Sequence, residues 1–319
     1  MSYAIWVIHM RYSNELTKNI KRLSIRLLFI TSLFPFVHFL DQFVIMQLLG
    51  LSIFVFIASA STVLVAGDII LSERVPVHGP VTESRVDVDS RIVQGQTADI
   101  AHYPHQVSFI VNNSYFCGGF IVSENYILTA AHCAQDVDPK TVLLRAGSSN
   151  RKNGTIIEIA EVTPFPDYDD PAFDKDVAVM KTAKPIVFNE YIQPIALPPA
   201  GRPMKANSIF KVSGWGRTKQ GASSIPETLM QVELPVVSRY ACFLTYPTVL
   251  TSNMFCGGNF FLGGEGTCQG DSGGAATQDN MAVGIVSFGR GCGQALSPSV
   301  FADIASPLLR DFITEKTGL

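Results

Sequence analysis

From residue 92 onward, the 319-residue chain predicts an all-β fold, and three observations support this prediction. Short runs rich in β-branched and aromatic residues recur, such as QVSFIV, TVLLRAG and MAVGIVSFG. Turn signals separate the runs, including Asn153-Gly154 and Pro198-Pro199. Many short strands at such spacing predict a β-barrel or a β-sandwich. The last segment, PLLRDFITEKTGL, has helical periodicity, which predicts a C-terminal helix with an apolar stripe of Leu308, Leu309, Phe312 and Ile313.

The N-terminal part of the chain predicts targeting segments. Residues 42–67 carry no charge and are long enough to span a bilayer. Small residues gather near the end of this run, as in Ala58-Ser59-Ala60, where a signal peptidase would cut. We therefore expect residues 46–67 to be a signal peptide, residues 1–45 to be an upstream extension, and the protein to be secreted. The alternative is a membrane anchor with a basic cytoplasmic flank.

Residues 68–91 have scattered charges, two prolines and no helical periodicity, and they predict a flexible connecting segment. The segment ends at Arg91, and the β-rich pattern begins just after it. The whole chain has a formal net charge of −3 and no basic stripe, which argues against nucleic acid as a partner.

All six cysteines lie in the β-rich part, and an even number behind a signal-like segment implies disulfides. The sequence alone does not choose among the fifteen possible pairings. A zinc site is disfavoured because no C-x-x-C pair exists and the only close cysteine and histidine neighbours are His132 and Cys133. Sequons at Asn112 and Asn153 would be available for glycans in a secretory compartment.

Residues 266–274, GTCQGDSGG, place Ser272 on a very bare stretch of backbone. The glycines could simply form a tight turn. They could also leave room around a nucleophile, so that a substrate and backbone N–H donors can both reach it. A hydroxyl is a weak nucleophile, and this second interpretation therefore requires a base and a group that orients the base.

A histidine is the expected base, and three follow residue 91. His102 and His105 have no marked context, whereas His132 follows an apolar strand in LTAAHC, among small residues that leave its ring accessible. The orienting carboxylate is expected to be Asp176, because it precedes the buried run VAVM and needs a partner when desolvated. Asp174 has no such run, and we expect it to be solvated and its replacement by Asn to be mild.

Seven short motifs follow one another along the β-rich part of the chain: RIVQG (91–95), CGGFIV (117–122), LTAAHC (128–133), DVAVM (176–180), SGWG (213–216), GDSGG (270–274) and SFG (287–289). Their order is that of the chymotrypsin/trypsin family of serine proteases, which this sequence resembles across residues 91–319. The order His, Asp, Ser also matches that family and differs from the α/β-hydrolases and the subtilisins.

The resemblance implies two six-stranded antiparallel β-barrels with the active site between them. Ser272 would attack the peptide carbonyl, His132 would carry the proton, and Asp176 would hold the imidazole in the right tautomer. The N–H groups of Gly270 and Ser272 would form the oxyanion hole. The disulfides implied are Cys117–Cys133, Cys242–Cys256 and Cys268–Cys292.

The resemblance also implies a zymogen. In the family, cleavage after the residue matching Arg91 frees the α-amino group of the next residue, here Ile92. That group folds inward and pairs with the carboxylate matching Asp271, since either charge alone is costly out of water. Residues 68–91 would then be the activation propeptide and residues 92–319 the serine protease domain.

The primary specificity pocket of the family lies beside CQGDSGG. The residue two before Cys268 corresponds to its floor, which is an aspartate in trypsins and Gly266 here. With no charge in the pocket, we expect cleavage after Phe, Tyr, Leu or Met. Arg290, beside the pocket mouth, is expected to favour acidic residues elsewhere in the substrate. The pocket walls would be formed by Ser287, Gly289 and Ser299.

Among family members, the sequence most resembles the secreted chymotrypsin-like digestive proteases of arthropods. No cysteine precedes residue 92, so nothing would tether the released propeptide. The loop after Gly147, SSNRKNG, lacks the acidic residues that bind calcium in trypsin-like relatives, and we expect no metal and no cofactor.

The expected partners are protein and peptide substrates, a trypsin-like activating protease and protein protease inhibitors, and the expected state is a monomer. Two alternatives remain. One is an inactive homologue that uses the fold for binding or regulation. The other is an active protease anchored in a membrane.

Overall fold

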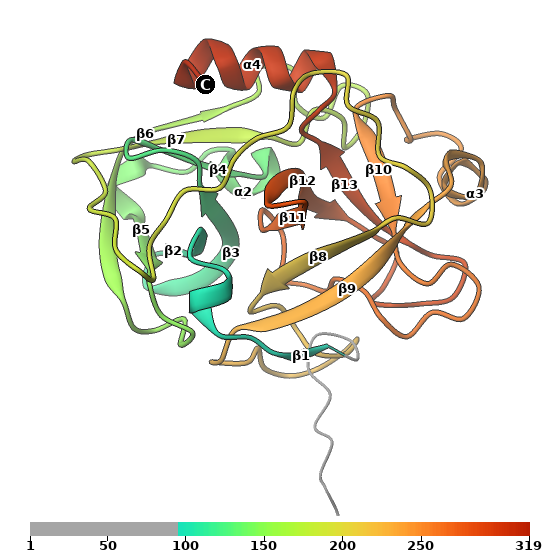
Figure 1. Cartoon of the computed structure of the whole chain (residues 1–319), viewed down its shortest axis with the longest axis horizontal. Coiled ribbons are helices and arrows are strands. Elements are labelled where there is room, and N and C mark those ends of the chain that lie inside the picture. Colours follow the sequence, from blue (N-terminus) through green and yellow to red (C-terminus); the bar gives the residue numbers. More distant parts are fainter. Residues whose placement is uncertain (1–94) are drawn as a thin grey trace, which may run out of the picture. The chain divides into compact units, whose positions relative to one another are not determined.

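The computed structural model describes residues 95–319, and two closed six-stranded antiparallel barrels organise this part of the chain (Figure 1). This confirms the predicted fold class. The first barrel closes in the order β2-β3-β4-β7-β6-β5. Its strands are β2 (Gln106–Val111), β3 (Ser114–Ile121), β4 (Tyr126–Thr129), β5 (Val142–Ala146), β6 (Thr155–Pro164) and β7 (Ala178–Thr182).

The strands of the second barrel follow the order β9-β10-β13-β12-β11-β8. The barrel closes because the two end strands, β9 and β8, also pair with each other. A short strand, β1 (Gln96–Thr97), adds to β9. The barrel strands are β8 (Ile209–Gly214), β9 (Met230–Val237), β10 (Met254–Gly257), β11 (Ala275–Gln278), β12 (Met281–Phe288) and β13 (Ser299–Asp303).

Buried residues alternate with more exposed ones along the strands, and tight turns connect neighbouring strands. These two features explain how the barrels form. In β5, VLLRA, every second residue is fully buried, as expected for a strand with one face on a core. The β2–β3 turn is made by Asn112 and Asn113, whose φ angles of 49° and 64° suit a tight hairpin and are tolerated well by asparagine. In the second barrel, Phe210, Phe255 and Phe301 pack with ring centroids 5.1–5.5 Å apart.

Within residues 95–319, the helices are few and short. The predicted C-terminal helix is confirmed as α4 (Pro307–Thr317), which starts with proline and stops at Gly318, where φ is 76°. Leu309, Phe312 and Ile313 are buried as expected, whereas Leu308 is exposed. The other helices are the 3-10 turns η2 (Ile100–His102) and η3 (Pro139–Thr141), and the α-helices α2 (Ala131–Ala134) and α3 (Arg239–Thr245).

The three disulfides implied by the resemblance are confirmed: Cys117–Cys133, Cys242–Cys256 and Cys268–Cys292. The predictions for residues 1–45, 46–67 and 68–91, together with Arg91 and Ile92, lie outside the described residues. Within residues 95–319, no helix combines the length and the apolarity needed to cross a bilayer.

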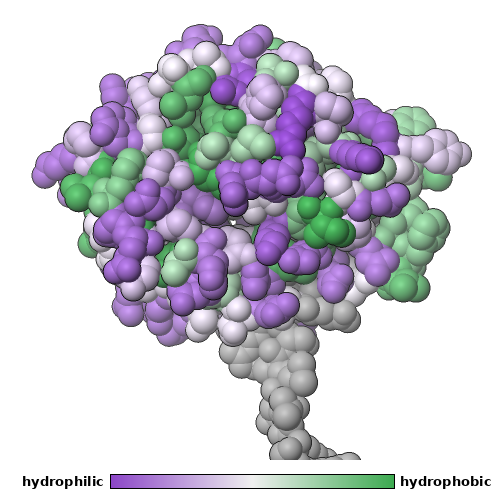
Figure 2. Space-filling view, in the orientation of Figure 1, coloured by the Kyte–Doolittle hydropathy of each residue, from purple (hydrophilic) through white to green (hydrophobic). Residues whose placement is uncertain are grey.

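Apolar side chains reach the surface around α3, where Figure 2 shows green patches at one edge of the view. Tyr240 and Leu244 of α3 and Phe261 and Leu262 of a nearby loop are exposed. That loop is close to α3, because Thr245 Oγ1 donates a hydrogen bond to the carbonyl of Leu296, whose N–H bonds to Phe260.

Direct hydrogen bonds join the two barrels. The N–H of Gly118 in the first barrel donates to the carbonyl of Ser272 at 2.8 Å. Ser213 Oγ donates to Gln106 Oε1, also at 2.8 Å, and both side chains are buried. The loop that carries Ser272 is therefore fixed against β3, close to where β4 ends.

Candidate active site

His132 and Asp176 come together because they flank two paired strands. β4 pairs with β7 through Thr129 and Ala178, so the residues just beyond these strand ends are neighbours. His132 Nδ1 lies 2.8 Å from Asp176 Oδ2, and the backbone N–H of His132 donates to Asp176 Oδ1 at 2.9 Å. A carboxylate can only accept, so Nδ1 carries the proton. His132 itself lies in the one-turn helix α2 after the strand, and its ring remains partly exposed.

The carboxylate of Asp176 is 2 % exposed and receives a third hydrogen bond, from the hydroxyl of Ser287 in the second barrel. Three donors offset the cost of removing the charge from water. Ser287 was expected to line the substrate pocket, and it does line a cavity beside Ser272. Its hydroxyl also donates to the carboxylate of Asp176, a contact that the sequence analysis missed.

Ser272 is half-buried and lies on a loop in which neighbouring atoms leave no room for a side chain at the next glycine. Gly273 has a φ of 80°, and a Cβ there would come within 2.5 Å of the carbonyl oxygen of Gly118 and would overlap Thr129 Oγ1. Bulkier residues would therefore push this loop away from β3. In the described part of the chain, Ser272 Oγ makes no hydrogen bond to His132 Nε2, a contact that in apo enzymes often tightens only when substrate binds.

The peptide before Asp271 is held by Tyr115, a residue that the sequence analysis did not single out. Tyr115 Oη donates to the carbonyl of Gly270 at 2.7 Å, and Gly270 has a φ of 101°. Burial raises the pKa of the Tyr115 hydroxyl, which keeps it a donor. Within residues 95–319, the N–H groups of Gly270 and Ser272 donate to no protein acceptor. Both are therefore available to bind an oxyanion.

Asp271 is fully buried beside the SGWG segment. Its Oδ1 accepts the N–H of Gly216 at 2.8 Å, and its Oδ2 accepts the N–H of Cys268 at 3.0 Å. Burial raises the pKa of this carboxyl to about 6, and the two N–H donors oppose the rise. A Cβ on Gly216 would approach both carboxylate oxygens to 2.5 Å, which explains the glycine. No cation pairs with Asp271 among the described residues.

A cavity of about 180 Å³ opens beside Ser272, and Ser287 and Gly289 are among the residues that line it. Gly266 and Ser299 are not among the lining residues. They lie next to Thr267, which does line the cavity and which the sequence analysis missed although it stands inside the GTCQGDSGG stretch. Thr267 Oγ1 donates to Ser299 Oγ at 2.8 Å.

Gly266 has no room for a side chain. A Cβ there would lie 2.9 Å from both Cα and N of Gly293, a distance that real Cβ atoms do not show. Around Gly289, by contrast, the nearest atom to a built Cβ is 3.6 Å away. The backbone of Gly293 therefore occupies the space that a larger residue at 266 would need.

Aromatic side chains and one cation lie next to the cavity. The ring of Phe288, which lines it, lies 4.7 Å from that of Phe173 and 5.5 Å from that of Tyr246. The guanidinium carbon of Arg290 lies 5.1 Å from the centroid of the Tyr246 ring. Arg290 is exposed and forms no ion pair within residues 95–319.

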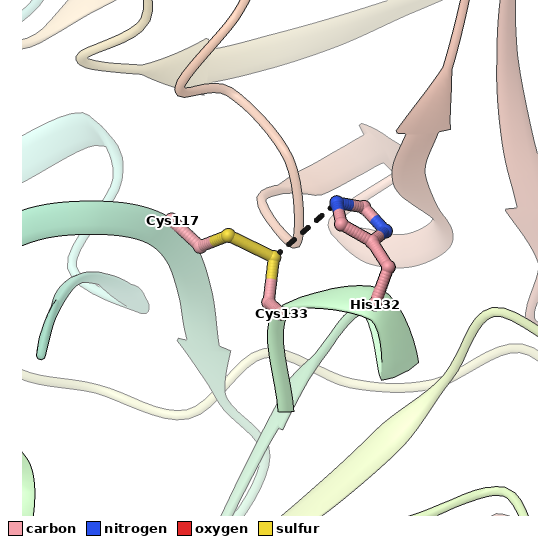
Figure 3. A group of neighbouring side chains, drawn as sticks. All are labelled: Cys117, His132 and Cys133. Carbon is pink, nitrogen blue, oxygen red and sulfur yellow. Dashed lines mark hydrogen bonds between the residues drawn. A yellow bond between two sulfur atoms is a disulfide. The ribbon is translucent and has the colours of Figure 1, made fainter. Parts of the chain in front are cut away.

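His132 also lies beside the Cys117–Cys133 disulfide (Figure 3). Its Nε2 is 3.5 Å from Cys133 Sγ. In the described part of the chain, these three residues are the one group of three or more histidine, cysteine or acidic side chains whose potential metal-ligand atoms all lie within 4.8 Å of one another. Their two sulfurs are bonded to each other, so they offer no thiolate, the form in which cysteine binds metals. The disulfide instead fixes α2, which carries His132.

The expectation that Asp174 is solvated was wrong. Asp174 is 3 % exposed, and its carboxylate accepts hydrogen bonds from Thr251 Oγ1 at 2.5 Å and from Asn253 Nδ2 at 3.1 Å. Both partners come from the segment before β10 in the second barrel. The sequence around Asp174 gave no sign of these distant donors.

His102 and His105 are not part of the site. Both line another cavity, of about 1010 Å³, that contains none of the predicted site residues. His105 is buried, and burial lowers its pKa to about 4, so its ring is neutral at physiological pH.

The comparisons with known proteins agree with this geometry. The Trypsin family model matches residues 92–313. Trypsin Blo t 3 of Blomia tropicalis is 36% identical over 239 residues, covering 72% of this chain and 90% of that protein. Trypsin 5G1 of Aedes aegypti is 37% identical over 232 residues, covering 72% and 86%. Putative trypsin-6 of Homo sapiens is 35% identical over 222 residues, covering 68% and 87%. With a family match over most of its length, the chain belongs to the trypsin family of serine endopeptidases.

Proposed function

We propose that this protease hydrolyses peptide bonds through Ser272, His132 and Asp176, with an acyl-enzyme intermediate. The hydrogen bonds between His132 and Asp176 carry this proposal, because they fix the tautomer in which Nε2 is free to accept a proton. Nε2 takes the proton of Ser272 as the hydroxyl attacks the carbonyl, and then gives it to the leaving amine. Asp176, held by Ser287 as well, stabilises the imidazolium that forms.

The free N–H groups of Gly270 and Ser272 support an oxyanion hole at the same loop. They would bind the oxygen of the tetrahedral intermediate, and one such donor contributes about 2.7–4 kcal/mol to lowering the barrier. Tyr115 supports this role, since its hydrogen bond to the carbonyl of Gly270 fixes the orientation of a neighbouring peptide.

The protein is made as a zymogen in this proposal. Asp271 is a buried carboxylate with two N–H donors and no cation in the described part of the chain. Cleavage after Arg91 frees the α-ammonium of Ile92, which is the cation that Asp271 lacks. The ion pair then fixes the loop from Cys268 to Ser272, and with it the oxyanion hole.

Large apolar side chains are the proposed preference before the scissile bond, although the relatives named above are called trypsins. The cavity beside Ser272 is lined by uncharged residues, and the approach of Gly293 to Gly266, next to the lining residue Thr267, leaves no space for an aspartate at position 266. A lysine or arginine would therefore lose its hydration without an opposing carboxylate. The exposed Arg290 favours acidic residues elsewhere in the substrate.

Secretion completes the proposal. Three disulfides suit an oxidising compartment, and the signal-like residues 46–67 precede them. The partners are protein and peptide substrates, a trypsin-like activator and protein protease inhibitors, and the enzyme acts as a monomer.

The test is covalent labelling of the secreted protein, cleaved after Arg91 with a trypsin-like protease, by a phosphonylating active-site reagent. We expect stoichiometric loss of peptidase activity and attachment of the label to Ser272, located by peptide mass spectrometry. A protein that neither reacts nor hydrolyses any member of a peptide library would be an inactive homologue, and the proposal would fail. N-terminal sequencing of the native protein locates signal and activation cleavage together.

A further inference from the structure

The buried carboxylate of Asp174 connects the two barrels just before the proposed catalytic carboxylate. Asp174 belongs to the loop between β6 and β7, and its donors, Thr251 and Asn253, belong to the second barrel. Asn253 is itself anchored, because its side-chain oxygen accepts the hydroxyl of Ser306 and its carbonyl accepts the N–H of Asp303. The side chain of Asp174 is therefore held by a rigid part of the neighbouring barrel.

The backbone on both sides of Asp174 has unfavourable geometry. Phe173 and Lys175 have φ angles of 63° and 59°, in the left-handed region that residues with side chains rarely adopt. Such residues persist only where the surrounding structure determines their conformation. Asp174 supplies that constraint, since its carboxylate is buried and accepts three hydrogen bonds from two side chains.

Asp176 follows this anchor by two residues. The N–H of Val177 donates to the carbonyl of Lys175 at 2.8 Å, so the chain turns tightly between the anchor and β7. A change in the backbone at Lys175 would therefore move Asp176 relative to both His132 and Ser287. Because the hydrogen bonds from these residues are about 2.8–2.9 Å or shorter, a small displacement would break them.

We propose that Asp174, through Thr251 and Asn253, is a positioning residue that holds Asp176 in the geometry required to orient His132. This proposal rests on the proposed catalytic function. It assigns to Asp174 a role in the rate of the chemical step, in addition to any contribution to stability. Asp174 acts through Asp176 and touches neither substrate nor the reacting atoms.

Two matched variants of Thr251 test the proposal in the activated full-length enzyme. Thr251→Val removes, with little change in shape, the hydroxyl that donates to Asp174 and accepts the N–H of Asn253, and Thr251→Ser keeps this hydroxyl. The active sites are counted by burst titration, and kcat per titrated site and KM are measured on one small amide substrate. We expect Thr251→Val to lower kcat roughly tenfold, as loss of a hydrogen bond to a charged group would. KM should stay within about twofold, and Thr251→Ser should restore kcat.

Asp174→Asn removes the charge and places the new amide N–H group against that of Asn253. We therefore expect a larger fall in kcat than for Thr251→Val. Asp167→Asn is the matched control, because Asp167 is an exposed residue of the same loop whose side chain forms no hydrogen bond in the described part of the chain. It should behave as wild type. The Thr251 pair keeps the test informative if Asp174→Asn does not fold.

The proposal is overturned if Thr251→Val is less stable to heat but has a wild-type kcat per titrated site, since the network would then be structural only. Equal losses in Thr251→Val and Thr251→Ser would also overturn it. Failure of the catalytic function looks different: the wild-type enzyme would show no burst, and Asp176→Asn would turn over substrate as fast as wild type.

Discussion

The carboxylate of Asp271 accepts the backbone N–H of Gly216 at 2.8 Å while being completely shielded from solvent. A second N–H, from Cys268, reaches its other oxygen. Neutral donors offset only part of the cost of burying a charge. In the proposed zymogen mechanism the loop that carries Ser272 therefore depends on whether a cation pairs with Asp271, and two predictions follow from this proposal.

Blocking activation is the first test. Arg91→Gln should give a secreted protein with negligible peptidase activity, because no α-ammonium forms to pair with Asp271. Activity is measured before and after treatment with a trypsin-like protease, which should activate the wild-type protein and leave the variant inactive. Full activity from the uncut variant would refute the zymogen mechanism.

The second test is the pH dependence of stability. Burial raises the pKa of Asp271 to about 6, from 3.8 for an unperturbed aspartate. Between these values the folded state binds more protons than the unfolded state, so the free energy of unfolding falls as pH rises. For the uncleaved Arg91→Gln protein the loss is about 2 kcal/mol between pH 4 and pH 7.

The measurement is urea unfolding of Arg91→Gln and of Arg91→Gln/Asp271→Asn at both pH values. Burial also raises the pKa of Asp303 to about 6, but this group is common to both proteins and cancels in the difference. The expected result is that the double variant loses less stability between pH 4 and pH 7. Identical pH dependence in the two proteins would show that Asp271 is not the responsible group.

The proposed triad should behave as a unit. Ser272→Ala and His132→Ala should each lower kcat by roughly 10⁴–10⁶, and Asp176→Asn by a comparable amount. Circular dichroism and the heat-unfolding temperature of Ser272→Ala should match wild type, because the hydroxyl makes no hydrogen bond in the described part of the chain. If Asp176→Asn kept most of its activity, another group would have to orient His132.

Short-range patterns explain why the fold and several site residues could be predicted from the sequence. Strand runs and turn signals are local, and so are the glycines around Ser272. The role of Asp174 could not be predicted because its donors, Thr251 and Asn253, lie 77 and 79 positions further along the chain. Nothing near Asp174 in sequence shows that it is paired, and only the meeting of the two barrels supplies the donors.

Other site residues were missed although signals stood next to them. Tyr115 comes shortly before the CGGFIV motif, and Thr267 directly follows Gly266, yet neither carries a charge or a reactive group that would draw attention. The tight approach of Gly293 to Gly266 is likewise invisible in the sequence, because it depends on how two loops 27 positions apart fold against each other.

Substrate preference is the sharpest remaining test, because the curated relatives carry the name trypsin. The activated enzyme is offered a peptide panel that varies only the residue before the scissile bond. We expect the highest kcat/KM for Phe, Tyr, Leu and Met. Burial of such a side chain contributes about 1.5–3 kcal/mol, whereas a cation would enter a pocket without a carboxylate. A preference for Lys or Arg would overturn the proposed role of Gly266.

The same pocket predicts how the zymogen is activated. An enzyme that prefers large apolar residues should cut its own Arg91 site poorly, so purified zymogen should remain inactive on prolonged incubation and become active when a trypsin-like protease is added.

Gly266→Asp should not simply restore trypsin-like preference. Its Cβ would lie 2.9 Å from the backbone of Gly293, so the variant must displace that loop first. We therefore expect Gly266→Asp to lower kcat/KM for Phe substrates at least tenfold, without reaching comparable activity on Arg substrates. Efficient cleavage after Arg by this variant would show that the loop yields easily and that Gly293 does not restrict the pocket.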